Sequence, residues 1–202
     1  MKILAIGRNY VDHIKELNNE IPDEPLIFMK PDTALLRNND PFYYPSYSTD
    51  IHYEVELVVK IDKVGKNIEK KFAPSYYNEF AIGIDLTARD IQNKAKDKGL
   101  PWLLSKGFDS SAPISKFRSK EGYDLSNLNF SLDIDGKKVQ EANTSLMMFD
   151  IDDIIVYISK FITVKKGDLI FTGTPKGVGP INIGNHVEAF LEQEKVMDFE
   201  VK

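Results

Sequence analysis

Two glutamates lie in the middle of an apolar stretch, "IHYEVELVVKI" at residues 51–61. The run of β-branched and aromatic residues predicts a β-strand. In a strand every second side chain points to the same face, so Glu54 and Glu56 would lie about 7 Å apart. Two like charges at that distance repel each other unless water or a cation separates them. The pattern therefore fits either the solvated face of a half-exposed strand or a pair of metal ligands.

A third carboxylate, Asp85, ends the apolar run "AIGID". Because an isolated charge at the end of a buried strand is costly, Asp85 must either cap the helix expected after it or join other charged groups. Combined with Glu54 and Glu56, it would complete a set of oxygen ligands that suits a hard cation such as Mg²⁺ or Mn²⁺. Three such ligands leave about three positions of an octahedral shell for water or a chelating substrate.

Other polar side chains are spaced for catalysis, although each has a simpler interpretation. His13 and Glu16 lie three residues apart on a predicted helix, where a carboxylate can hold a histidine tautomer for general-base work. Arg89 and Gln92 have the same spacing on a second predicted helix. Lys106 follows an apolar turn. The alternatives are that His13 and Glu16 form an exposed surface pair and that Arg89 and Gln92 lie on the surface of their helix. Lys106 would then be an ordinary lysine with a buried aliphatic stem.

Composition excludes several classes of function. The chain has 202 residues, 42% of them hydrophobic and 28% charged, as in an ordinary globular domain. A net charge of −5 without a basic run argues against nucleic-acid binding. The absence of cysteine excludes a thiol nucleophile. Since no apolar stretch approaches the length of a membrane span, we expect a cytoplasmic protein with no membrane partner, formed by one catalytic domain over residues 1–202.

The expected elements favour a β-rich α+β domain over a doubly wound sheet, because strands outnumber helices and a local hairpin is plain. Asp135 and Gly136 form the hairpin turn, since Asp-Gly favours a tight primed turn. Strands are predicted at 2–7, 25–31, 51–61, 79–86, 127–134, 137–142, 167–173, 186–192 and 196–201, and helices at 11–18, 87–99 and 150–162.

Several motifs together resemble the fumarylacetoacetate hydrolase family. They are "GRNYVDHIKE", "FMKPDTALL", "YEVEL", "GIDLTARDIQ", "GLPWLLSKGFDSSAPI", "EANTSLMMF" and "GDLIFTGTPKGVGPI", and they follow the family's order over nearly the whole chain. The chain is most similar to the short form, which includes acylpyruvases and oxaloacetate decarboxylases. The resemblance implies a mixed β-roll, similar to a sandwich or barrel, with a few peripheral helices, and a homodimer.

The resemblance also implies a metal centre and a catalytic pair. Glu54, Glu56 and Asp85 would hold Mg²⁺ or Mn²⁺. In similar enzymes the segment with His13 and Glu16 closes as a lid over the substrate, and the pair activates water. The motif N-Y-x-x-H-x-x-E is matched in full by this chain.

Four further residues take roles by resemblance alone. Lys106 would lie near the metal and stabilise an enolate or oxyanion as charge develops. Arg89 and Gln92 would line the pocket, with Gln92 reaching distal substrate oxygens. The segment "GTPKGVGP" lacks the spacing of a Walker loop and reads as a tight turn. In the family this loop forms a wall of the site, where Thr174 binds the substrate carboxylate.

The predicted activity is metal-dependent cleavage of a C–C bond in small 2-oxo acids, by acylpyruvate hydrolysis or oxaloacetate decarboxylation through a pyruvate enolate. An isomerase or decarboxylase of 2-hydroxy-diene-dioates from aromatic catabolism is an alternative, as is a dehydratase of sugar-derived 2-oxo acids. A protein that binds a metal and a carboxylate without catalysis belongs to another class. His13, Glu16 and Lys106 argue against that alternative, because a binding protein has no evident need for them.

Overall fold

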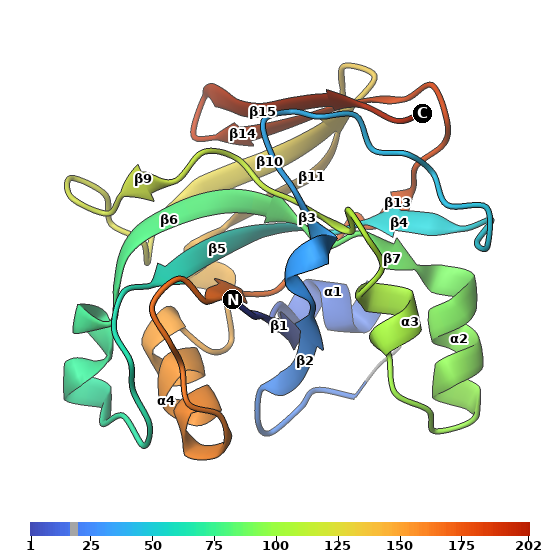
Figure 1. Ribbon diagram of the computed structural model, residues 1–202. Helices are drawn as coiled ribbons and strands as arrows, with labels where there is room; N and C mark the ends of the chain where they lie inside the picture. Colours follow the sequence, from blue (N-terminus) through green and yellow to red (C-terminus); the bar gives the residue numbers. More distant parts are fainter. Residues whose placement is uncertain (17–19) are drawn as a thin grey trace.

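A six-stranded mixed sheet forms the centre of the molecule (Figure 1), with strand order β2-β1-β12-β5-β6-β9. The computed structural model describes residues 1–16 and 20–202. The strands of this sheet are β1 (Ile3–Gly7), β2 (Leu26–Lys30), β5 (Val55–Ile61), β6 (Tyr77–Ile84), β9 (Arg118–Ser119) and β12 (Leu169–Phe171). Neighbours are antiparallel except for β1 and β12, which run parallel.

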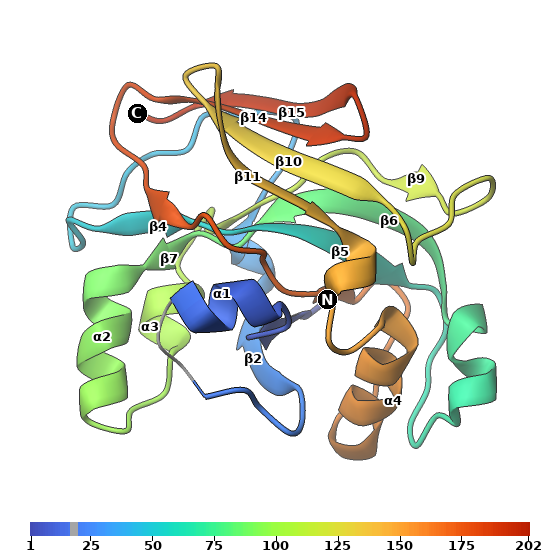
Figure 2. The ribbon, with the colours of Figure 1, turned by 180° about the vertical axis from the view of Figure 1, so that it is seen from behind.

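A four-stranded antiparallel sheet packs over β5 and β6 (Figures 1 and 2), in the order β11-β10-β14-β15. Its strands are β10 (Asn129–Ile134), β11 (Lys137–Asn143), β14 (His186–Leu191) and β15 (Glu194–Glu200). Leu57 and Phe80 of the first sheet meet Phe130 and Val187 of the second in the main core. Val58 belongs to a second apolar cluster. Because β5 is buried on both faces, its sequence is an almost continuous apolar run.

The helices lie on the side of β5 and β6 away from the four-stranded sheet (Figures 1 and 2). They are α1 (Val11–Glu16), α2 (Arg89–Asp97), α3 (Leu103–Lys106) and α4 (Ile151–Phe161), with 3₁₀ turns at Asp32–Ala34, Lys70–Ser75 and Thr144–Leu146. Short strands complete two small sheets: β13 (Gly179–Pro180), β4 (Ile51–Tyr53) and β7 (Thr87–Ala88) in one, β3 (Leu35–Leu36) and β8 (Ala112–Pro113) in the other. Among the described residues, no helix has the length and apolar character needed to cross a bilayer.

The predicted strand over 51–61 is wrong in one respect, because the chain changes sheets within it. β4 pairs with β13 and β7, whereas β5 pairs with β12 and β6. Glu54 lies at the break between them. The interpretation of 51–61 as a half-exposed strand with a solvated face is also wrong, since Glu54 is 5% exposed and Glu56 1% exposed.

Most of the remaining predictions of local structure are confirmed. Asp135 and Gly136 both have positive φ, 52° and 73°, as a type I′ turn requires. Asp150 caps α4 by accepting a hydrogen bond from the Asp153 N–H at 2.7 Å. The helix predicted from residue 87 starts two residues later, so Asp85 does not cap it. The helix predicted over 11–18 is described to Glu16, and its Leu17 lies outside the described residues.

Strand-rich α+β architecture with few helices is therefore confirmed. The resemblance suggested a form similar to a sandwich or a barrel. Over the described ranges the sheets stay open and do not close into a barrel.

Candidate active site

Three carboxylates from the ends of two neighbouring strands meet in the interior. Glu54 directly precedes β5, Glu56 is the second residue of β5, and Asp85 follows β6 directly. The antiparallel register places Glu56 opposite Gly83, and the Asp85 N–H donates to the Glu54 carbonyl at 2.8 Å. One carboxylate oxygen from each residue lies within 4.8 Å of the others, and all three residues are buried. We refer to Glu54, Glu56 and Asp85 as the buried triad.

Cationic side chains contact two members of the buried triad. The Lys106 ammonium donates to Glu54 Oε2 at 2.8 Å and to Asp85 Oδ2 at 2.6 Å, and its third bond goes to Thr87 Oγ1 at 2.6 Å. Arg89 donates to Glu54 Oε1 at 2.5 Å. The guanidinium of Arg89 thus pairs with Glu54, and not with Asp85 or with Asp90 on its own helix. Helix α3 places Lys106 there because Ser105 and Lys106 face inward.

Glu56 is in a different electrostatic environment. Within the described part of the chain, no lysine or arginine forms an ion pair with it, and its Oε2 accepts a hydrogen bond from the Gly173 N–H at 2.7 Å. Burial and the neighbouring Asp85 charge raise the pKa of Glu56 well above its ordinary value. Burial acts in the same direction on Glu54, but Lys106 and Arg89 outweigh it and lower the pKa of Glu54. An uncompensated acidic group thus remains at Glu56.

The residues of the buried triad fit a divalent cation. Oxygen-only donors that converge from three carboxylates are the ligands that Mg²⁺ and Mn²⁺ prefer. A cation between them would also supply the positive charge that Glu56 lacks. These residues offer no sulfur or imidazole ligand, so the set favours hard cations over zinc or copper.

His13 and Glu16 approach the triad from α1. His13 Nδ1 lies 3.2 Å from Glu16 Oε2, and the histidine is 5% exposed. Burial lowers the pKa of His13, and the nearby Glu54 and Glu16 charges only partly oppose this effect. The imidazole is therefore mostly neutral near pH 7. The simpler interpretation of His13 and Glu16 as an exposed surface pair is wrong for His13.

A small cavity of about 40 Å³ brings the predicted residues together. Eight of the nine candidates line it: His13, Glu54, Glu56, Asp85, Arg89, Gln92, Lys106 and Thr174. Glu16 does not line the cavity, but it contacts His13 behind the ring. The alternative position of Arg89 and Gln92 on an exposed helix surface is wrong, since they are 8% and 3% exposed. Arg89 donates a hydrogen bond to Gln92 Oε1 at 2.6 Å.

The segment Thr172–Gly177 joins separate parts of the site. Gly173 donates to Glu56, whereas the Gly177 N–H donates to Glu16 Oε1 at 3.0 Å. Thr174 lies between these two contacts and lines the cavity. Gly173 has a φ of 105°, and a Cβ there would lie 2.7 Å from the Asn9 Cβ, so only glycine fits. This segment is more than a tight turn, because it contacts both the triad and the His13–Glu16 pair.

Sequence reasoning missed two buried polar residues beside the site. Lys30, at the end of β2, is 0% exposed, and its ammonium lies 2.7 Å from Asp85 Oδ1. It also donates to the carbonyl oxygens of Lys106, Leu86 and Ser111. Gln140 of β11 is 2% exposed and contacts Thr174. A lysine or a glutamine within a predicted strand indicates an unusual buried polar residue, but it does not identify the residue that its side chain contacts.

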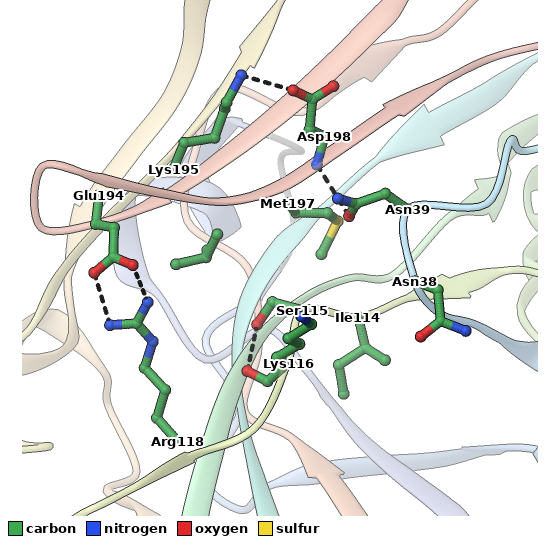
Figure 3. A pocket seen from close by; sticks show the side chains of 11 residues that line it. Asn38, Asn39, Ile114, Ser115, Lys116, Arg118, Glu194, Lys195, Met197 and Asp198 are labelled. Atoms are coloured by element: carbon green, nitrogen blue, oxygen red, sulfur yellow. Dashed lines mark hydrogen bonds and ion pairs between the residues drawn. The ribbon is translucent and has the colours of Figure 1, made fainter.

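A larger cavity of about 550 Å³ lies elsewhere, between β15 and the segments 38–39 and 114–118. Figure 3 shows that four of its charged side chains form two ion pairs: Arg118 with Glu194, and Lys195 with Asp198. Asp198 also belongs to a second group of metal-ligand types, His186, Glu188 and Asp198, which we call the surface triad. All three of its residues are partly exposed.

Comparison with known proteins identifies the chain's relatives. The family model described as fumarylacetoacetate (FAA) hydrolase C-terminal matches residues 2–202. The chain is 45% identical over 201 residues to oxaloacetate tautomerase FAHD1, mitochondrial, of Mus musculus, covering 99% of this chain and 91% of that protein. It is 47% identical over 189 residues to the mitochondrial oxaloacetate decarboxylase of Dictyostelium discoideum, covering 93% and 87%.

A solved structure has the same fold. Fumarylpyruvate hydrolase from Pseudomonas aeruginosa, in complex with Mn²⁺ and pyruvate, superimposes with a TM-score of 0.94 at 31% identity. The match covers all of this chain and 89% of the other.

Proposed function

Because the chain belongs to the fumarylacetoacetate hydrolase family, we propose that it is a metal-dependent enzyme that breaks a C–C bond in small 2-oxo acids. The convergence of the buried triad with Lys106 and a neutral His13 in one cavity carries this proposal. The names of the relatives, oxaloacetate decarboxylase and oxaloacetate tautomerase, support a substrate with a 2-oxo acid group. The whole of 1–202 would act as one catalytic unit, since β11 of the second sheet contacts the wall of the site.

Glu54, Glu56 and Asp85 are proposed to hold Mg²⁺ or Mn²⁺. The Mn²⁺ and pyruvate in the similar fumarylpyruvate hydrolase support this assignment. The bound cation would supply Lewis-acid polarisation of the 2-oxo group. Thr174 would donate to the substrate carboxylate, and Arg89 and Gln92 would face its distal oxygens.

Lys106 is proposed to stabilise the charge that develops during cleavage. When the C3–C4 bond of oxaloacetate breaks, C4 leaves as carbon dioxide. The electron pair then forms the C2=C3 double bond of an enolate. The ammonium of Lys106, already in the cavity wall, would exchange one of its three present acceptors, on Glu54, Asp85 or Thr87, for the enolate oxygen. Protonation at C3 then gives pyruvate.

His13 and Glu16 are proposed to act when the substrate is an acylpyruvate. A neutral imidazole can take a proton from water, and Glu16 at 3.2 Å would stabilise the imidazolium that forms. The water oxygen attacks the C4 carbonyl, the C3–C4 bond breaks, and C4 leaves as a carboxylic acid. The same enolate remains on C2 and C3, so one site serves both reactions.

Tautomerisation of oxaloacetate is a second candidate reaction. The neutral His13 favours it, because the ring can accept the enol proton and a proton can be returned to C3 without any bond cleavage between carbons. The tautomerase relatives support this alternative.

Substrate entry requires movement of α1. The cavity of about 40 Å³ has room for roughly one or two water molecules and not for an oxo acid. Helix α1 carries His13 over the cavity, and its Glu16 is held by Gly177. We propose that the helix swings away from this contact for entry and returns once the substrate is bound.

A homodimer is proposed as the working form. Tyr43, Tyr47, Leu103 and Leu104 expose between 55% and 74% of their surface around one apolar hollow, beside the helix that carries Lys106. Such a contiguous apolar surface is typical of an interface. We expect a dimer by light scattering and a monomer for Leu104→Asp.

The cytoplasmic location stays a prediction, and the mitochondrial location of the relatives does not support it.

The test follows acetylpyruvate and oxaloacetate by ultraviolet absorbance, with Mg²⁺ or Mn²⁺ and with a chelator, after subtraction of the metal-only background. Coupled detection of pyruvate separates decarboxylation from tautomerisation, which removes the enol without forming pyruvate. Chelator-sensitive turnover supports the proposal, and the preferred compound identifies the reaction. No turnover of either compound contradicts it and favours the longer diene-dioates.

A further inference from the structure

The geometry points to Gln140 as a positioning residue that fixes the direction of the Thr174 hydroxyl proton. The inference rests on the proposed function, in which Thr174 binds the substrate carboxylate. Gln140 lies on β11, in the four-stranded sheet, and its side chain forms no hydrogen bond with the side chains of the buried triad. Its hydrogen bond to Thr174 is therefore its direct link to the proposed substrate site.

Gln140 is a buried polar residue whose amide is fully used. It is 2% exposed. Its Oε1 accepts a hydrogen bond from the Val55 N–H at 2.9 Å. Its Nε2 donates to Thr174 Oγ1 and to the Pro175 carbonyl, both at 2.9 Å. The side chain thus links the strand between Glu54 and Glu56 to the segment Thr172–Gly177.

The orientation of this amide is determined by its two backbone partners. A backbone N–H can only donate, and a carbonyl can only accept. If the amide of Gln140 were rotated by half a turn, its NH₂ would face the Val55 N–H and its oxygen would face the Pro175 carbonyl. Both contacts would then be repulsive. The NH₂ group must therefore face Thr174.

This orientation decides which way the Thr174 hydroxyl donates. A hydroxyl carries one proton and two acceptor lone pairs. Because Thr174 Oγ1 already accepts from Gln140, its own proton cannot point back along that bond. Thr174 is 4% exposed and lines the cavity, so the proton is available to an acceptor placed there. A substrate carboxylate is such an acceptor, and it meets a donor that is oriented before binding.

The main chain on either side of Thr174 is held close to the same two elements. Gly173 donates to Glu56 of β5. A Cβ at Gly177 would lie 2.3 Å from the Val139 carbonyl of β11, so the segment and the strand are in direct backbone contact. The segment therefore stays in place when the Gln140 side chain is changed, and the hydroxyl direction can be altered separately.

Gln140→Glu tests this inference, because the side chain keeps its shape and the acceptor for Val55 but loses the N–H donors to both Thr174 and the Pro175 carbonyl. The Thr174 hydroxyl would then donate to the introduced carboxylate and turn its lone pairs toward the substrate. We expect the KM for oxaloacetate and the dissociation constant of oxalate, measured by calorimetry with Mn²⁺, to rise about tenfold or more. We expect kcat to change less. Gln140→Met removes both the donor to Thr174 and the acceptor for Val55 without reversing polarity, and the part of its effect that depends on the Thr174 hydroxyl should be smaller.

Thr174→Val supplies the matched background. Once the hydroxyl is gone, Gln140→Glu should weaken oxalate binding no further. An equal loss in both backgrounds, or unchanged oxalate affinity in Gln140→Glu, overturns the inference. If Gln140→Glu does not fold, the comparison of Gln140→Met with and without Thr174→Val decides in the same way. Oxalate affinity separates this test from the proposed function, whose failure appears as absent turnover in the wild-type protein.

Discussion

The buried triad and the surface triad are built from similar residues in similar positions. Each has two ligand types two residues apart on one chain segment and a third from the neighbouring strand. Each is also bridged by a lysine. Lys106 contacts two carboxylates of the buried triad, and Lys195 contacts Glu188 at 2.9 Å and Asp198 at 2.6 Å.

The two triads differ in their access to water. The Lys106 side chain is 3% exposed, whereas the Lys195 side chain is 45% exposed. Around the surface triad, water and salt screen each charge, so the ion pairs contribute little. Inside the cavity the charges cannot be screened, and each must be matched by a partner. The same set of ligand types therefore fits a metal site when it is buried and a solvated strand face when it is exposed, so the burial must be known before a function is inferred.

The largest difference between the two triads is expected in turnover. Glu56→Gln should lower kcat/KM for the preferred 2-oxo acid by roughly 10³-fold or more, because Lewis-acid stabilisation amounts to several kcal/mol. The amide oxygen can still accept from Gly173, so the fold should be retained. The matched Glu188→Gln variant should keep wild-type turnover. Comparable losses in the two variants, in steady-state assays at saturating Mn²⁺, would remove the distinction.

The next largest difference between the two triads is expected in how much a neighbouring lysine contributes to the free energy of unfolding. Lys30→Met leaves one oxygen of Asp85 unpaired and removes one donor from each of three carbonyl groups, and we expect a loss of about 3–5 kcal/mol in the free energy of unfolding. Lys195→Met should cost less than about 1 kcal/mol. Urea unfolding in the presence of chelator measures both. A small effect at Lys30 would mean that its ammonium is not needed to compensate Asp85.

Metal ions should stabilise the protein through one triad only. At a Mn²⁺ concentration one hundred times its dissociation constant, binding adds about 2.7 kcal/mol to the stability of the folded protein. Thermal melting with and without Mn²⁺ should show this gain in the wild-type protein and in Asp198→Asn. The gain should vanish in Glu56→Gln. If Asp198→Asn lost it instead, the metal site would be on the surface.

The smallest effect concerns pH and two of the three histidines, His13 beside the buried triad and His186 in the surface triad. Burial lowers the pKa of His13 below its ordinary value of 6.5, so the neutral base is lost only as the pH falls below that value. Between pH 8 and 6.5, kcat/KM for acetylpyruvate should therefore fall less than about twofold, with the acid limb at lower pH. His186→Gln should leave this profile unchanged. An acid limb above pH 6.5 would contradict the neutral state of His13.

The sequence predicted the parts of the site that short motifs encode. Spacing and strand periodicity were enough to suggest that Glu54, Glu56 and Asp85 converge as candidate metal ligands, and helix spacing paired His13 with Glu16. The hairpin at Asp135 followed from turn chemistry alone. Apart from the place of Asp85 beside the two glutamates, these features depend on residues close together in the chain.

The remaining features depend on contacts between distant segments. The change of sheet at Glu54 arises because β4 and β5 find different partners, which periodicity does not report. Lys30 meets Asp85 across 55 positions of sequence, and Gln140 meets Thr174 across 34. Neither partner could be identified from local pattern, since a buried lysine or glutamine looks the same whatever it contacts.

The antiparallel register of β5 and β6 has a consequence for folding. A slip by one residue would exchange the two faces of β5. Glu54 and Glu56 would then enter the apolar layer that faces the second sheet, and Val55 and Leu57 would be displaced from it. Burying two carboxyl groups without partners is costly, so the slipped pairing is less stable than the native one. The carboxylates proposed to hold the metal thus also favour the native register of the central strands.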